Sequence, residues 1–108
     1  MRLLAQFLAF ALFAFPAAAL AATPQFSIAL KAHQFVPKEL EIPAGKKVEL
    51  RVRNNDPAPA EFESTSLHRE EVVVGGGEIR VFLGPLDPGR YTFFDDFHPS
   101  TRGTLIVK

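Results

Sequence analysis

The stretch YTFFDDFHPSTRGTLIV, residues 91–107, decides the fold of this chain. Its two ends, residues 91–94 and 104–107, are short runs rich in aromatic and β-branched side chains, which predicts two β-strands. Between them, residues 95–103 contain Asp, Pro, Ser and Gly, the residue types of a loop. The stretch therefore predicts a C-terminal hairpin whose loop presents one histidine and two carboxylates.

The rest of the chain after residue 24 repeats this pattern of short alternating runs separated by turn residues. The run over residues 47–54 alternates most clearly, with Val48, Leu50 and Val52 on one face. Helical periodicity is absent, so we predict an all-β sandwich of about seven or eight strands. The strands are expected near residues 25–30, 39–42, 47–54, 61–64, 70–74, 78–83, 91–94 and 104–107.

Tyr91 follows a turn rich in glycine and proline at residues 84–90. This placement resembles the tyrosine corner of Greek-key sandwiches, in which the phenol caps a nearby backbone group. We therefore expect Tyr91 to have a structural role.

The first 21 residues have the organisation of an export signal. Arg2 gives a positive start, residues 3–15 form an apolar run, and residues 19–21 are a small-residue cleavage motif. A membrane-spanning helix is a weaker interpretation, because polar and proline residues interrupt the run. We expect residues 1–21 to be removed as a signal peptide, which leaves 87 of the 108 residues, 22–108, as one small periplasmic domain.

The composition narrows the possible chemistry. The chain has 12 Lys and Arg residues against 12 Asp and Glu residues, a balance that gives no support for nucleic-acid binding or a polybasic membrane patch. It has no cysteine, and its only methionine is Met1, within the expected signal. The mature domain is therefore expected to have no disulfide, no redox thiol and no sulfur ligand for Cu(I), an ion that soft sulfur donors select.

Six segments after the expected signal form one pattern: FVPKELEIPAG (35–45), NND (54–56), EFES (61–64), LDPGRY (86–91), FH (97–98) and GTLIV (103–107). Together they resemble the cupredoxin family. Within it, they are similar to small cupredoxin-like proteins of bacterial ferrous-iron uptake systems, the EfeO-type and FtrB-type components. This resemblance implies a Greek-key β-sandwich in the periplasm that binds iron or copper, works beside an iron permease and assists oxidation coupled to import.

The chain departs from the cupredoxin pattern at the metal ligands. The resemblance places Ala60 at the position of the first histidine ligand, Asp95 at that of the cysteine, and Thr101 or Arg102 at that of the methionine. Only the hairpin histidine, His98, is kept. Because a type 1 copper centre needs two histidines, a cysteine and a weak axial ligand, the sequence argues against blue-copper electron transfer.

A different ligand set is predicted for this chain. The resemblance implies that the segment around Glu61 and the hairpin meet at one end of the sandwich, so that Glu61 approaches Asp95, Asp96 and His98. Imidazole and carboxylate ligands suit Fe(II), Zn(II), Mn(II) or Cu(II). We predict an open, low-affinity site for iron or copper formed by His98, Glu61, Asp95 and Asp96.

Plainer interpretations of these residues remain open. Adjacent Asp residues often cap turns, and a histidine beside a proline is often an ordinary surface residue. His33 and His68 are weaker metal candidates, and Arg69 could pair with Glu63 or Glu71 instead of serving a site. The chain would then be a metal-free interaction module that docks to another periplasmic or membrane subunit.

No catalytic residue is assigned. The serines lack a histidine and an acid at the spacing of a known nucleophile motif, and a domain of this size has little room for a deep substrate cleft. At most, the protein is expected to assist iron oxidation coupled to transport.

Overall fold

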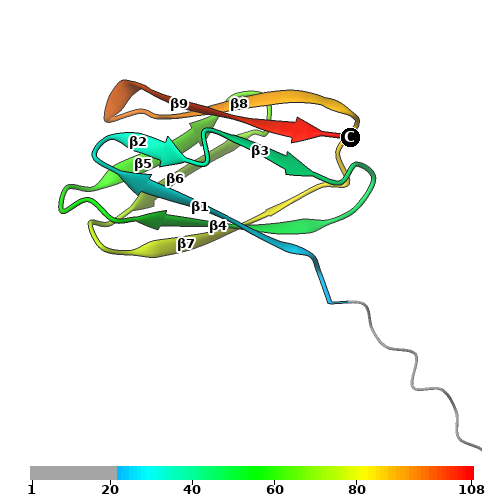
Figure 1. Cartoon of the computed structure of the whole chain (residues 1–108), viewed down its shortest axis with the longest axis horizontal. Coiled ribbons are helices and arrows are strands. Elements are labelled where there is room, and N and C mark those ends of the chain that lie inside the picture. The colour runs from blue at the N-terminus through cyan, green and yellow to red at the C-terminus, as the bar shows by residue number, and fades with distance from the viewer. Residues whose placement is uncertain (1–21) are drawn as a thin grey trace, which may run out of the picture.

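The computed structural model describes residues 22–108, and the expected signal peptide, residues 1–21, lies outside the described residues. Two β-sheets pack face to face as a sandwich (Figure 1). The strands are β1 (Gln25–Lys31), β2 (Gln34–Val36), β3 (Glu39–Ile42), β4 (Val48–Asn54), β5 (Ala60–Ser64), β6 (Arg69–Val73), β7 (Glu78–Leu83), β8 (Gly89–Asp95) and β9 (His98–Val107). Among residues 22–108 there is no helix long and apolar enough to cross a membrane.

The nine strands divide into a four-stranded sheet, in the order β2-β1-β4-β7, and a five-stranded sheet, in the order β3-β9-β8-β5-β6. Two pairs are parallel, β1 with β4 and β3 with β9, whereas the other pairs are antiparallel. The all-β sandwich predicted from sequence is confirmed. Strand β2 was not predicted, because three residues are too few to show an alternating pattern.

The core forms where the inner faces of the two sheets meet. The predicted alternation in β4 is confirmed, since Val48, Leu50 and Val52 are all buried. Phe93 of β8 is fully buried, and its ring centroid lies 4.9 Å from that of Phe35 and 5.3 Å from that of Phe62. These three rings fill the half of the core nearest the β8–β9 turn and join β2, β5 and β8.

Tyr91 caps a backbone group as predicted. Its hydroxyl donates a 2.8 Å hydrogen bond to the carbonyl oxygen of Asp87, in the turn that precedes β8. The predicted tyrosine corner is therefore present, and Tyr91 has a structural role.

The predicted loop over residues 95–103 is wrong in its extent, because β9 begins at His98. The N–H of Phe97 donates to Oδ1 of Asp95, which closes a tight turn, and Asp95 and His98 are ladder partners. The next ladder pair is Phe94 with Arg102, so residues 99–101 bulge out of β9. The expected ligand loop is a two-residue turn followed by this bulge.

Gly103 gives a test of the packing between β9 and the core. A Cβ at this position would collide with the ring of Phe93 and lie 3.0 Å from the carbonyl oxygen of Lys38. Because the buried ring cannot move aside, we expect Gly103→Ala to lower the free energy of unfolding by roughly 1–3 kcal/mol in urea denaturation. Gly89→Ala is the matched control, since its Cβ would meet Tyr91 at an ordinary 3.6 Å. Equal losses in the two variants would contradict this account.

Candidate functional site

Three chain segments gather at the end of the sandwich that carries the β8–β9 turn, as Figure 1 shows. They are the β1–β2 turn, the β4–β5 loop and the β8–β9 turn, and together they line a pocket of about 170 Å³. Ala60, Asp95 and His98 all line it. Three of the positions that the cupredoxin resemblance assigned to metal ligands therefore do converge, although Ala60 has no donor atom, whereas Thr101 and Arg102 do not line this pocket.

Asp95 has a structural role in this pocket. Its side chain is buried, and Oδ1 accepts the backbone N–H of Glu61 at 2.9 Å and that of Phe97 at 3.0 Å. One carboxylate oxygen thus joins β5 to the β8–β9 turn. Asp95 therefore stands where a cupredoxin has its cysteine ligand, but here it accepts hydrogen bonds from the backbone.

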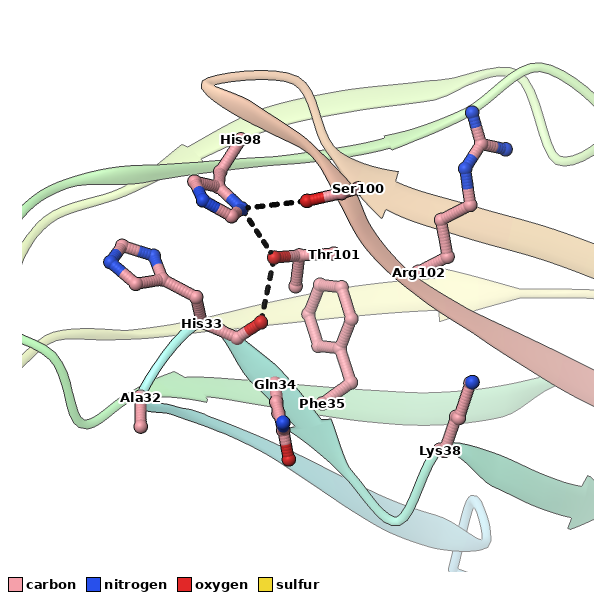
Figure 2. A pocket seen from close by; sticks show the side chains of 9 residues that line it. All are labelled: Ala32, His33, Gln34, Phe35, Lys38, His98, Ser100, Thr101 and Arg102. Atoms are coloured by element: carbon pink, nitrogen blue, oxygen red, sulfur yellow. Dashed lines mark hydrogen bonds between the residues drawn. The ribbon is translucent and has the colours of Figure 1, made fainter.

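His98 is held by hydrogen bonds on one side of its ring (Figure 2). The Thr101 hydroxyl donates to the carbonyl oxygen of His33 at 2.7 Å, so its oxygen is left to accept from His98 Nδ1 at 2.8 Å. Nδ1 therefore carries the proton, and Nε2 of the neutral ring has the free lone pair. This is the hydrogen-bonding pattern of a histidine prepared to bind through Nε2.

The ring of His98 also stacks on that of His33. The two centroids are 4.3 Å apart and the planes differ by 17°. A metal ion must lie close to the plane of each imidazole that binds it, and two nearly parallel stacked planes offer no common position. In this arrangement, the two histidines cannot bind one ion together.

The β1–β2 turn is fixed by Asp56. Ala32 and His33 have positive φ values of 50° and 57°, which are unusual for residues with side chains. Their N–H groups donate to Oδ1 and Oδ2 of Asp56 at 2.7 and 3.0 Å. The bond from His33, more than any other contact, lowers the pKa of Asp56. This carboxylate is therefore used to hold the turn that presents His33.

Glu61 lies in a different place, on the outer face of the five-stranded sheet. One oxygen from each of Glu61, Glu63 and Glu70 lies within 4.8 Å of the others, a group named here the carboxylate cluster. Glu63 and Glu70 are directly opposed partners on β5 and β6, and Glu61 is two residues before Glu63 on the same face. No other group of three His, Cys, Asp or Glu ligands within residues 22–108 is gathered so closely.

Glu61 is the unusual member of the carboxylate cluster. Its side chain is only 9% exposed, and Oε1 is buried without a hydrogen-bond partner among the described residues. Glu63 and Glu70 line a pocket of about 280 Å³, which opens the cluster to solvent. The arrangement thus combines a buried, unsatisfied carboxylate oxygen with an open approach.

The crowding of these carboxylates raises the pKa of Glu61 and of Glu63. The hydrogen bond that the protonated carboxyl can make with Glu70, followed by burial and by the charges of Glu70, Asp96 and Glu63, raises the pKa of Glu61 to about 7. Burial, with the charges of Asp96 and Glu70, also raises the pKa of Glu63. Negative charge at this face is therefore unfavourable unless a proton or another cation offsets it.

The structure divides the four residues predicted as one metal site. Asp96 lies beside Glu61, since its N–H donates to the Glu61 carbonyl oxygen at 3.0 Å, and its charge acts on Glu61. Asp95 is directed to the inner side of the sheet as the ladder partner of Phe62, and His98 lies at the sandwich end. A common role for the four as metal ligands stays a prediction.

Sequence reasoning found Glu61 but not its two partners. The alternation of β5 already placed Glu61 and Glu63 on one face, and this signal could have identified Glu63. Glu70 joins them only through the register of β5 and β6, which the sequence does not give.

Arg69 and His68 both have roles in the backbone around the turn before β6. The guanidinium group of Arg69 donates to the carbonyl oxygens of Leu67, His68 and Phe82, and makes no ion pair with Glu63 or Glu71. The suggested pairing is therefore wrong, because backbone carbonyls from the turn and from β7 satisfy the guanidinium. His68 has a φ of 54° and occupies the turn before β6.

Comparisons with known proteins agree with this fold. The sequence model of the cupredoxin-like domain family matches residues 4–107. A protein of Rickettsia prowazekii (strain Madrid E), described as uncharacterized, is 43% identical over 84 residues, which cover 77% of this chain and 67% of that protein.

Solved structures share the architecture at low sequence identity. The metal-binding domain of the Cu(I)-exporting P-type ATPase CopA of Streptococcus pneumoniae D39, solved with Cu(I), gives a TM-score of 0.71 at 16% identity, over 78% of this chain and 84% of that one. Auracyanin A, a blue copper protein of Chloroflexus aurantiacus, gives 0.66 at 16% identity, over 78% and 98%. A purple cupredoxin from Nitrosopumilus maritimus gives 0.60 at 22% identity, over 76% and 98%. These likenesses show the fold alone.

A blue-copper site does not fit this chain. Cysteine is absent from the sequence, Ala60 stands where the first histidine is expected, and Asp95 is engaged with two backbone N–H groups. The sandwich is therefore that of a cupredoxin without the sulfur ligands that define type 1 copper.

The role assigned to Asp95 predicts a stability effect. Asp95→Ala leaves two backbone N–H groups without their acceptor, so we expect the free energy of unfolding to fall by roughly 1–3 kcal/mol. Asp95→Asn keeps an acceptor oxygen and should lose clearly less. Denaturant titration of both variants measures the difference, and an equal loss in the two would show that the acceptor is not what matters.

The raised pKa of Glu61 predicts a pH dependence of stability. Folded Glu61 holds its proton up to about pH 7, whereas the unfolded chain releases it near 4.5. Between these values the folded state binds more protons, so stability increases as the pH falls and is lost as the pH rises through 7. Glu61→Gln should flatten this part of the stability profile in thermal or urea unfolding, and Glu71→Gln should not. An unchanged slope in Glu61→Gln would refute the assignment.

Proposed function

Because this chain belongs to the cupredoxin-like domain family, we propose that it is a metal-handling domain that holds its ion on carboxylates instead of sulfur ligands. The proposal rests on Glu61, whose Oε1 is buried without a partner among the described residues and whose carboxylate has one oxygen within 4.8 Å of an oxygen of Glu63 and of Glu70. A buried anionic oxygen without a donor is costly unless a cation or proton meets it. A metal ion bound by Glu61, Glu63 and Glu70 would meet this need.

The ligand type indicates which ions fit. Carboxylate oxygens are hard donors that suit Fe(II), Fe(III), Mn(II) or Mg(II), and they do not favour Cu(I). The charge of Asp96 adds attraction for a cation. Two of the three ligands face solvent, which favours a site that loads and releases its ion over one that keeps it permanently.

We propose further that the protein serves ferrous-iron uptake in the periplasm. Support comes from the resemblance of its segments to EfeO-type and FtrB-type components and from the export signal expected at residues 1–21. In this role it would capture Fe(II), or a Cu(II) ion that assists its oxidation, and pass iron to a permease. The domain would act as an ion carrier beside the transporter, without a catalytic residue of its own.

A metal-free docking module is the second candidate. The observation in its favour is Phe97, which is 53% exposed at the tip of the β8–β9 turn, beside the apolar residues Ala58 and Pro59 of the same pocket. An exposed aromatic side chain at a rigid turn is suited to contact another subunit.

Calorimetric titration of the protein with Fe(II) under anaerobic conditions, and separately with Mn(II) and Cu(II), tests the metal proposal. We expect saturable binding of Fe(II) and Mn(II) that weakens at least about tenfold in Glu61→Gln and Glu70→Gln, because loss even of an outer-shell partner costs roughly 10- to 100-fold. Glu71→Gln removes the same charge one residue away and should bind as the wild type does.

The other outcomes of this titration are equally informative. Binding lost in His98→Ala but kept in Glu61→Gln would locate the ion at the sandwich end and contradict the carboxylate cluster. Absence of binding by Fe(II), Mn(II) and Cu(II) would reject metal handling and leave the docking module.

A further inference from the structure

A second pocket lies between the β1–β2 segment, the start of β3 and the bulge in β9 (Figure 2). Its volume is about 470 Å³. Figure 2 shows the imidazoles of His33 and His98 at one end and the side chains of Lys38 and Arg102 at the other. We name it the basic pocket. Its polar lining residues are Gln34, Lys38, Ser100, Thr101, Arg102 and the two histidines.

The basic pocket has positive charge without a counter-charge. No Asp or Glu lines it. Neither Lys38 nor Arg102 makes a salt bridge or a side-chain hydrogen bond within the part of the chain that the structure describes. Nearby basic residues do find acids, since Arg90 pairs with Glu39 at 2.9 Å and Lys108 with Glu41 at 3.6 Å. What sets this pocket apart is that two cations and two imidazoles line it and no acid does.

The backbone holds these groups in place. The N–H of Thr104 donates to the carbonyl oxygen of Lys38 at 2.9 Å, which fastens Lys38 against β9. The guanidinium carbon of Arg102 lies 5.3 Å from the centre of the Phe94 ring, a cation–π contact that restrains this side chain. Buried Phe35 and Thr101 form the floor. The backbone of Lys38 and the side chain of Arg102 are thus both restrained beside β9.

We propose that the basic pocket binds a small oxyanion with two or more negative charges, of the phosphate or polycarboxylate class. Lys38 provides a point charge and Arg102 a planar pair of donors, a combination that suits phosphate and carboxylate oxygens. The Ser100 hydroxyl and the Gln34 amide supply neutral donors within the same pocket. A cation is disfavoured there because nothing in the lining carries negative charge.

The basic pocket and the carboxylate cluster are separate sites, since β8 lies between β9, which carries Arg102, and β5, which carries Glu63. Arg102 and Glu63 are the ladder partners on either side of Phe94, so their backbones are about two strand spacings, roughly 10 Å, apart. The two functions can therefore be measured independently. Anion binding does not depend on the proposed metal site.

Titration of the metal-free protein with inorganic phosphate and, separately, with citrate tests the inference. Binding is followed by calorimetry and by amide chemical shifts of Ser100 and Arg102. We expect saturable binding that weakens at least about tenfold in Lys38→Gln and in Arg102→Gln, the loss expected when one charge-assisted hydrogen bond is removed. The preference between phosphate and citrate identifies which of the two oxyanions the pocket suits.

Two controls separate a built site from general charge attraction. Lys46→Gln removes one positive charge in an exposed turn away from the pocket and should leave affinity within about twofold. Glu61→Gln should also leave it unchanged, which separates this result from the metal titration. No saturable binding of either anion, or an equal loss in Lys38→Gln and Lys46→Gln, would overturn the proposal.

Discussion

The hydrogen bonds accepted by Oδ1 of Asp95 are the constraint on which the rest of the arrangement depends. This one atom receives the N–H of Glu61 from β5 and the N–H of Phe97 from the turn that begins β9. It therefore sets where β8 ends, how tightly the chain reverses and how β5 lies beside the turn. Since β5 is fixed in this position, Glu61 is directed to the outer face of the sheet and β9 begins at His98.

The same constraint explains why the carboxylate cluster lies away from the usual metal position of a cupredoxin. At the sandwich end, Asp95 and Asp56 use their oxygens to hold backbone turns, and the stacked histidines cannot share an ion. On the outer face, the register of β5 and β6 sets Glu63 opposite Glu70 beside the buried Glu61. Opposed like charges weaken a sheet, so this cluster is a cost to folding that a bound cation would relieve.

Much of the fold could be predicted from local patterns, because strand alternation and turn chemistry act over a few residues. The inward faces of β1, β4 and β7 and the role of Tyr91 follow from such patterns. The length of the hairpin loop could not be predicted, because the start of β9 depends on a hydrogen bond from the Phe97 N–H to Asp95 and on the bulge at residues 99–101. The carboxylate cluster could be predicted only in part, since the sequence named Glu61 but its approach to Glu70 depends on the register between strands. The basic pocket beside Lys38 and Arg102 depends on strand arrangement in the same way.

The measurement that tests the account most directly is paramagnetic broadening of backbone amide signals by substoichiometric Mn(II). Manganese broadens signals near its binding position, so the pattern locates the ion without any substitution. The account predicts that the amides of residues 61–63 and 70 broaden first and most strongly, while those of His33 and His98 broaden later and less. Broadening centred on His33 and His98, or uniform weak broadening over the whole domain, would contradict a metal site on the carboxylate cluster.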